Sequence, residues 1–289
     1  MNTQTPAAVQ LTHLLHQNAD PALGVFLPAG YPTPSKGVDL LHAFVQQGAA
    51  VLEVGVPTGS APLDGPVISA AYEHALRHGA RMADVMDTVR HAADSGAPVV
   101  VMSYWSPVAE YGVEPFAQGL AEAGAAGAMI PDLPLDQAGP WLAAARTAGI
   151  HTPQFAPRDA DENLLTRISA AASGWIYAPA VTAATGYRGE LDLEALNRFT
   201  TRLRAATAQP VVAGIGISTP LRARAVAPYV SGIVMGTPAV RPLLETPGAA
   251  GRTRSIGCVR AFAEALHATT AVARPLRDHG HAAHSLPHH

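Results

Sequence analysis

Short apolar runs alternate with longer amphipathic stretches along most of the chain. The runs are rich in Val, Ile and Leu, and the stretches between them carry apolar residues at helical spacing, several ending in Gly. The pattern predicts eight strands, near residues 23–28, 50–55, 98–104, 127–132, 151–156, 174–178, 210–214 and 231–236. It also predicts an extra N-terminal helix near 6–17, and a helix that begins with Thr219 as N-cap and Pro220 in its first turn.

Strands that alternate with helices indicate an α/β protein with a parallel sheet, because parallel neighbours need crossover connections. Eight units with continuously apolar strands predict a (β/α)8 TIM barrel, and a doubly wound open sheet is the competing fold. We expect a single barrel domain over residues 1–272, with the helix near 6–17 plugging its bottom. The tail over 273–289 is rich in histidine, and we expect it to be disordered rather than to form a metal site.

Composition narrows the class of protein. Of 289 residues, 48% are hydrophobic and 14% charged, and the net charge of −3 gives no reason to expect nucleic acid or an acidic membrane as partner. The single cysteine, Cys258, cannot form an internal disulfide, and we expect a packed thiol in a helix. The N-terminus lacks an export signal and no apolar run is long enough to cross a bilayer. We therefore expect a soluble, cytoplasmic protein.

Two carboxylates surround the end of the second predicted strand. Glu53 lies within the apolar run LEVG, where burial would raise its pKa and make it a proton carrier near neutral pH. Asp64 follows in the loop behind the same strand, the face of a barrel that carries catalysis. The alternatives are a structural hydrogen-bond network for Glu53 and a simple turn for Asp64.

Glycines follow the last three predicted strands and suggest a phosphate site. Gly186 follows the sixth strand, Gly214 and Gly216 follow the seventh, and Gly236 and Thr237 follow the eighth. Barrels bind phosphate at these loops through backbone N–H groups, although tight turns alone would also use glycine. The sequence shows no dinucleotide or Walker motif and no metal-ligand cluster. A phosphorylated small substrate and acid/base chemistry, without cofactor or metal, is the prediction from the residues.

Seven segments, in order, resemble the α subunit of tryptophan synthase. They are FLPAGYP at 26–32, LEVGVP with PLDGP at 52–66, MSYWSPVAEYG at 102–112, PDLPLDQ at 131–137, IYAPAVTAATG at 176–186, AGIGIS at 213–218 and GIVMGTPAV at 232–240. The resemblance extends over roughly residues 8 to 270. It implies a (β/α)8 barrel that cleaves indole-3-glycerol phosphate to indole and glyceraldehyde 3-phosphate, without a cofactor.

The same resemblance assigns roles to individual residues. It implies that Glu53 is the general acid/base and that Asp64 holds the indole N–H and stabilises the indolenine, with Tyr177 near the acid. Thr185 would contact the strand-2 loop when the loop after strand 6 closes. The implied phosphate ligands are Gly186, Gly216, Gly236 and Thr237, and the implied indole pocket is lined by Phe26, Tyr104, Met129 and Phe155.

Several positions depart from the family pattern. The strand-2 loop reads PTGSAPLDGP where the family usually has PFSDPLADGP, so Ser60 and Ala61 replace Asp and Pro. That Asp belongs to the surface that signals to the partner β subunit, and Ala183 replaces a customary Gly in the strand-6 loop. Ser106 and Tyr31 replace a customary Asn and Asp. Coupling to a tryptophan synthase β subunit is therefore open to question.

Four hypotheses remain open from the sequence. The first is an indole-3-glycerol phosphate lyase that works alone or with an unusual partner, and the second is a conventional α subunit that depends on a β subunit. The third is a non-catalytic phosphate-binding barrel with a regulatory or scaffold role. The fourth is a barrel that acts on a modified indole or another aryl-glycerol phosphate, in a pocket reshaped by Trp105 and Phe155.

Overall fold

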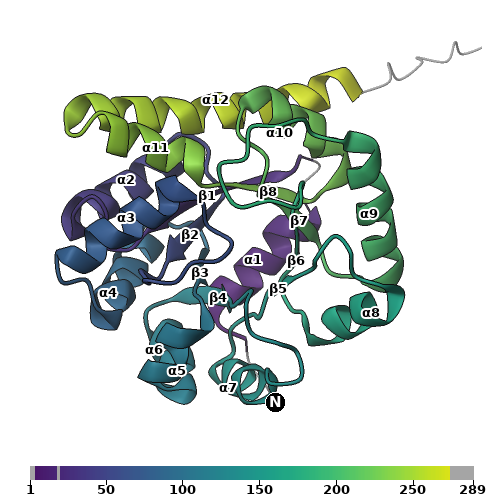
Figure 1. Cartoon of the computed structure of the whole chain (residues 1–289), viewed down its shortest axis with the longest axis horizontal. Coiled ribbons are helices and arrows are strands. Elements are labelled where there is room, and N and C mark those ends of the chain that lie inside the picture. Colours follow the sequence, from purple (N-terminus) through teal and green to yellow (C-terminus); the bar gives the residue numbers. More distant parts are fainter. Residues whose placement is uncertain (1–3, 18–19, 274–289) are drawn as a thin grey trace, which may run out of the picture.

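Eight parallel strands form a nearly closed barrel in the computed structural model, which describes residues 4–17 and 20–273 (Figure 1). The strands are β1 (Ala22–Pro28), β2 (Val51–Gly55), β3 (Val99–Met102), β4 (Ala125–Met129), β5 (Gln154–Phe155), β6 (Ile176–Ala178), β7 (Val211–Ala213) and β8 (Gly232–Met235). They pair in the order β4-β3-β2-β1-β8-β7-β6-β5, and a single bridge between Gly127 and His151 joins β4 to the segment just before β5. This topology confirms the predicted TIM barrel and excludes the open doubly wound sheet.

Helices surround the barrel, as expected for crossovers between parallel strands. They are α1 (Pro6–Gln17), α2 (Pro34–Gln46), α3 (Pro66–Arg77), α4 (Met82–Ala93), α5 (Trp105–Tyr111), α6 (Val113–Glu122), α7 (Gly139–Ala148), α8 (Glu162–Ala171), α9 (Leu193–Ala206), α10 (Pro220–Val226), α11 (Thr237–Glu245) and α12 (Ala249–Ala273). Every residue of β1 and β2 is buried, because helices cover one face and the barrel core the other. Thr219 caps α10 as predicted, its Oγ1 accepting a hydrogen bond from Arg222 N at 3.2 Å.

The extra N-terminal helix lies where the sequence predicts it, at the N-terminal ends of the strands. Helix α1 crosses the ring of strands in Figure 1, and Leu15 contributes to the small cavity at the barrel floor. His151, just before β5, fixes the helix, because its buried Nε2 lies 3.0 Å from both the Ala8 carbonyl and Thr12 Oγ1. With the bottom closed in this way, the opposite end of the barrel remains open for a site.

Some predicted strands are shorter in the structure. The strand expected at 151–156 is reduced to β5, because Pro153 and Pro157 on either side lack the N–H that a ladder needs.

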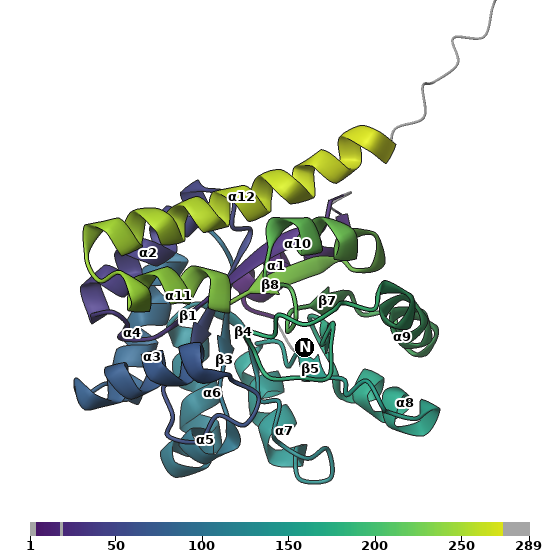
Figure 2. The same cartoon turned by 45° about the horizontal axis from the view of Figure 1, so that its top comes forward.

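Helix α12, which packs against α11, α10 and α2, runs across one side of the barrel to Ala273 (Figure 2). The tail predicted beyond it lies outside the described residues, and the division at 272 stays a prediction. No helix in the described ranges combines the length and hydropathy of a membrane span.

Candidate active site

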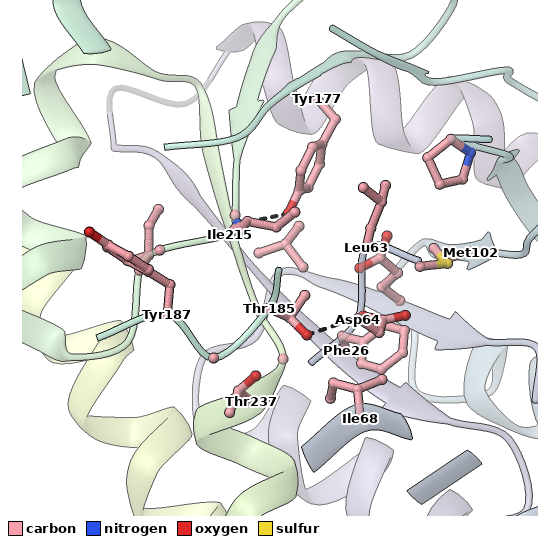
Figure 3. A pocket seen from close by; sticks show the side chains of 18 of the residues that line it. Phe26, Leu63, Asp64, Ile68, Met102, Tyr177, Thr185, Tyr187, Ile215 and Thr237 are labelled. Atoms are coloured by element: carbon pink, nitrogen blue, oxygen red, sulfur yellow. Dashed lines mark hydrogen bonds between the residues drawn. The ribbon is translucent and has the colours of Figure 1, made fainter. Parts of the chain in front are cut away.

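A single cavity opens at the C-terminal ends of the strands and brings together residues from most of the loops there (Figure 3). The wall of the cavity contains two carboxyl side chains, several apolar side chains and four glycines. The lining residues are Phe26, Glu53, Leu63, Asp64, Ile68, Met102, Met129, Pro131, Phe155, Tyr177, Thr185, Gly186, Tyr187, Gly214, Ile215, Gly216, Ile217, Ser218, Val234, Gly236, Thr237 and Pro238. This is the end of a TIM barrel at which active sites occur.

Glu53 points into this cavity from the middle of β2. It pairs in register with Phe26 of β1, which lines the same cavity, and only 4% of its surface is exposed. No group among the described residues forms a hydrogen bond with its Oε1. Burial, together with the negative charge of Asp64, raises the pKa of Glu53 to about 8. The side chain therefore carries a proton at neutral pH, as a general acid must.

Asp64 occupies a more polar environment in the loop after β2, here called loop 2 (residues 56–65). Its Oδ2 accepts a hydrogen bond from Tyr104 Oη at 3.0 Å, and its Oδ1 accepts one from Thr185 Oγ1 at 3.2 Å (Figure 3). Burial raises the pKa of Asp64 to about 6, and the two hydrogen bonds oppose that rise. At neutral pH, one carboxyl of the pair is mostly ionised while the other is mostly protonated.

Loop 6 (residues 179–192) is joined to loop 2 by a set of short-range contacts. Thr185 N donates to the Leu63 carbonyl at 3.0 Å, and Gly65 N donates to Thr185 Oγ1 at 2.9 Å. The close approach requires glycine at position 65, since a Cβ there would lie 2.1 Å from the Thr185 carbonyl oxygen. The two loops together cover the carboxylates, and Thr185 is the residue that connects them.

Tyr177, from β6, is held on the opposite side of the cavity from Asp64 (Figure 3). Its hydroxyl accepts a hydrogen bond from Ile215 N at 3.0 Å, which leaves the O–H free to donate into the cavity. Burial and the charge of Glu53 both raise the pKa of Tyr177, so the phenol stays neutral. Gly214 makes room for the ring, because a Cβ there would lie 1.7 Å from the hydroxyl. Gly214 thus has a steric role, and its part in a phosphate site stays a prediction.

The glycines predicted to bind phosphate all line the cavity, and Gly186 and Thr237 form one part of its wall. Gly186 lies against Thr237, with 3.4 Å between a Cβ built on the glycine and Thr237 Cγ2. The Thr237 hydroxyl is buried and, within the described chain, has no hydrogen-bond partner. Thr237 is the first residue of α11, so the positive end of that helix dipole points at this wall. The guanidinium of Arg241, one turn later, adds positive charge 3.9 Å from the same Cβ position.

Comparison with known proteins identifies the family. The model of the family described as "Tryptophan synthase alpha chain" matches residues 13–269. The chain belongs to the tryptophan synthase alpha chain family. A tryptophan synthase alpha chain of Streptomyces avermitilis is 43% identical over 198 residues, covering 68% of this chain and 71% of that protein, and one of Streptomyces coelicolor is 42% identical over 68% and 73%.

Solved structures agree with the sequence comparison. A tryptophan synthase structure from Mycobacterium tuberculosis superimposes with a TM-score of 0.82 at 32% identity, covering 91% of this chain and 98% of that chain. The tryptophan synthase subunit alpha of Legionella pneumophila gives 0.81 at 28% identity, covering 93% and 99%. The resemblance stated from the motifs is confirmed, and so is the fold that it implied.

The structure brings nearly all predicted site residues to one cavity. Phe26, Met129 and Phe155 line it together with the carboxylates, Tyr177, Thr185 and the predicted phosphate ligands. Tyr104, predicted to line the indole pocket, instead supports Asp64 through its hydroxyl and does not line the cavity. The apolar wall of the cavity was not predicted from the sequence; it is formed by Leu63, Ile68, Met102, Pro131 and Val234. Met102 and Val234 lie in predicted strands, but strand membership alone does not show which residues face the cavity.

Ser60 and Ala183, two of the positions that depart from the family pattern, lie in the two loops that carry this network, loop 2 and loop 6. Ser60 is exposed, and its backbone N and O contact the hydroxyl of Thr58. Ala183 does not require the left-handed conformation, since every described residue with positive φ is a glycine. The Gly→Ala difference therefore does not prevent Thr185 from reaching Asp64. Separately, no group of three or more His, Cys, Asp or Glu side chains within the described residues is placed to hold a metal ion.

The contact between loops 2 and 6 yields a steric prediction. In Gly65→Ala, the new Cβ would overlap the Thr185 carbonyl, so loop 6 should detach from loop 2. Trypsin should then cut after the exposed Arg188 of loop 6 about tenfold faster. Gly59→Ala is the matched control in loop 2, because a Cβ there meets nothing within 4 Å and the rate should stay unchanged. Equal cleavage of both variants would show that Gly65 does not control the loop.

Proposed function

We propose that the chain cleaves indole-3-glycerol phosphate to indole and glyceraldehyde 3-phosphate, with Glu53 as general acid/base and Asp64 as the partner of the indole nitrogen. Family membership supports the reaction. The observation that carries the residue assignment is the buried, unpartnered Oε1 of Glu53 in the same cavity as a partnered Asp64. Glu53 and Asp64 are the only carboxyl side chains among the lining residues.

In the proposed reaction, Glu53 donates a proton in the first step and takes one up in the second. Glu53 gives its proton to C3 of the indole ring, which turns the ring into a leaving group, and the negative charge of Asp64 stabilises the positive nitrogen that results. The C–C bond then breaks, its electron pair returns to the ring, and the glycerol hydroxyl loses its proton to the Glu53 carboxylate as the aldehyde forms. Glu53 ends the cycle protonated again, so the reaction needs no other proton carrier.

The remaining lining residues hold the substrate at its two ends. Phe26, Met129 and Phe155 provide the apolar and aromatic surface that an indole ring requires. Gly186, Gly216, Gly236 and Thr237 would take the phosphate, since their backbones can approach closely and the Thr237 hydroxyl has no partner without it. Thr185 would keep loop 6 closed over the carboxylates during cleavage.

Glu53→Gln tests the assigned acid. The amide keeps the shape of the side chain but cannot give up a proton to carbon, so release of indole from indole-3-glycerol phosphate should fall by about 10³-fold. The exposed carboxylate of Glu73, on α3, provides the control Glu73→Gln, which should keep full activity. Full activity in Glu53→Gln would reject Glu53 as the acid, and no indole from the unmodified protein would favour the non-catalytic scaffold.

The pH dependence follows from the two carboxyls. Cleavage (kcat/KM) should fall above about pH 8 as Glu53 loses its proton, and below about pH 6 as Asp64 gains one. Asp64→Asn should remove the enzyme's acid limb and also move the alkaline limb to lower pH, because the Asp64 charge contributes to the raised pKa of Glu53. The substrate phosphate titrates near pH 6, and any acid limb that remains in the variant belongs to it. An unmoved alkaline limb would contradict the coupling.

A second part of the proposal concerns whether cleavage depends on a β subunit. We infer that cleavage proceeds in this chain alone, since the contacts that hold loop 6 on loop 2 come entirely from Leu63, Asp64, Gly65 and Thr185. Ser60 supports this inference, because a hydroxyl replaces the carboxylate that the family uses for signalling. A conventional α subunit, activated by its β subunit, is the alternative.

Steady-state cleavage with and without a tryptophan synthase β subunit separates these two. We expect the rate of the chain alone to rise by less than about fivefold on saturation with the partner, below the usual range of allosteric coupling. Ser60→Asp restores the family's carboxylate, and its rate should respond more strongly to the partner. A chain that is nearly inactive alone and rises steeply with the β subunit would be a conventional α subunit.

A further inference from the structure

A fully buried tyrosine hydroxyl near the carboxylates has no assigned role. Tyr72, on α3, has no exposed surface, and its hydroxyl is one of four buried side-chain polar atoms without a partner in the described residues. Of the other three, Trp175 Nε1 belongs to the residues around the barrel floor, and Thr237 Oγ1 lies at the proposed phosphate wall. The fourth is Glu53 Oε1. The upper part of the barrel thus contains an unused donor and an unused acceptor.

The backbone of β2 explains how the hydroxyl reaches the barrel interior. A Cβ built on Gly55 would lie 2.9 Å from the Tyr72 hydroxyl and 2.5 Å from Cζ of Phe26, so both rings occupy the space that a side chain would fill. Side chains two apart on a strand share a face and are separated by about 6.6 Å. The Tyr72 hydroxyl above Gly55 is therefore on the face from which Glu53 projects. Phe26, edge-on to Tyr72 with ring centroids 6.3 Å apart, fixes the ring.

Each of the other polar groups around the two carboxyls has at least one partner, although the O–H of Tyr177 remains free to donate into the cavity. Both oxygens of Asp64 accept hydrogen bonds, from Tyr104 and Thr185. Tyr104 donates to Asp64, and Tyr177 accepts from Ile215 N. Burying a polar group without a partner costs free energy, so an unused donor on the same face of β2 as an unused acceptor requires a reason.

We propose that Tyr72 is a positioning residue for Glu53, whose hydroxyl donates a hydrogen bond to the Glu53 carboxylate once that group has given up its proton. This inference rests on the function proposed above. While Glu53 is protonated, its carboxyl needs no additional donor. After proton transfer to carbon, the buried carboxylate carries a full negative charge, and a hydroxyl that was left free can stabilise it. The Tyr72 hydroxyl therefore acts during proton transfer from Glu53, and not while Glu53 is protonated.

The electrostatics of the cluster agree with this geometry. The groups that face Glu53 and Tyr72 are Asp64 from loop 2, Tyr104 after β3 and Tyr177 on β6. Burial first, and then the charges of Asp64 and Glu53 among others, raise the pKa of Tyr72 well above its ordinary value. The phenol therefore keeps its proton and remains a donor throughout the range in which Glu53 titrates.

Tyr72→Phe removes only the hydroxyl, which has no partner in residues 4–17 and 20–273, so the thermal midpoint should not fall. The side-chain carboxyl of Glu53 can be titrated by ¹³C nuclear magnetic resonance without substrate, its signal assigned by its loss in Glu53→Gln. The pKa of Glu53 should rise by about one pH unit in Tyr72→Phe, a tenfold change in the ionisation constant. Tyr111→Phe, which alters an exposed tyrosine on α5, should leave it unchanged.

Activity provides the second readout. In Tyr72→Phe, kcat should fall about tenfold with little change in KM, and the alkaline limb of the pH profile should move up, whereas Tyr104→Phe should move the acid limb through Asp64. An unchanged Glu53 titration in Tyr72→Phe would overturn the inference, as would a shifted titration with unchanged kcat. If the unmodified protein releases no indole, the proposed function fails, while the titration still decides whether Tyr72 acts on Glu53.

Discussion

The site depends on one costly arrangement, a carboxyl group buried in an apolar strand with an oxygen that meets no hydrogen-bond partner in the part of the chain that the structure describes. Such burial disfavours the charged form and so keeps a proton on Glu53 near neutral pH. Strand β2 can hold the group because its neighbours β1 and β3 pair with it on both sides and fix its direction. The stability lost at this position is tolerable in a barrel whose strands, apart from the short β5, are fully buried and largely apolar.

Two carboxyls of the same chemistry differ because their surroundings differ. Asp64 lies in a loop and receives two hydroxyl donors, whereas Glu53 lies in a strand whose backbone groups are used by the sheet. Loop 2 can meet a donor from another loop, as Thr185 of loop 6 shows, whereas no described group forms a hydrogen bond with Oε1 of Glu53 on β2. The division of labour between proton transfer and charge stabilisation therefore follows from where on the barrel each residue lies.

Much of this arrangement could be predicted from the sequence, and the rest depends on contacts between distant segments. The apolar runs predicted eight strands, and an acid inside one of them predicted Glu53 as a site residue. Gly214 could be noticed as a glycine after β7, but its reason, the hydroxyl of Tyr177, comes from another strand. Tyr104 and Tyr72 carry no local signal, since one acts through Asp64 and the other projects across Gly55. Strand β5 is shorter than predicted, because the prediction followed the apolar pattern and did not allow for the prolines on either side.

The departures from the family pattern can be separated physically from the chemistry. Ser60 is exposed and contacts Thr58, and Ala183 has an ordinary backbone conformation, so neither disturbs the hydrogen bonds that join Asp64 and Thr185. A substitution in that network would remove a donor from a buried carboxylate, whereas a substitution at the exposed rim changes only what another protein could contact. The same barrel can therefore lose or alter its response to a partner while the cleavage machinery stays intact.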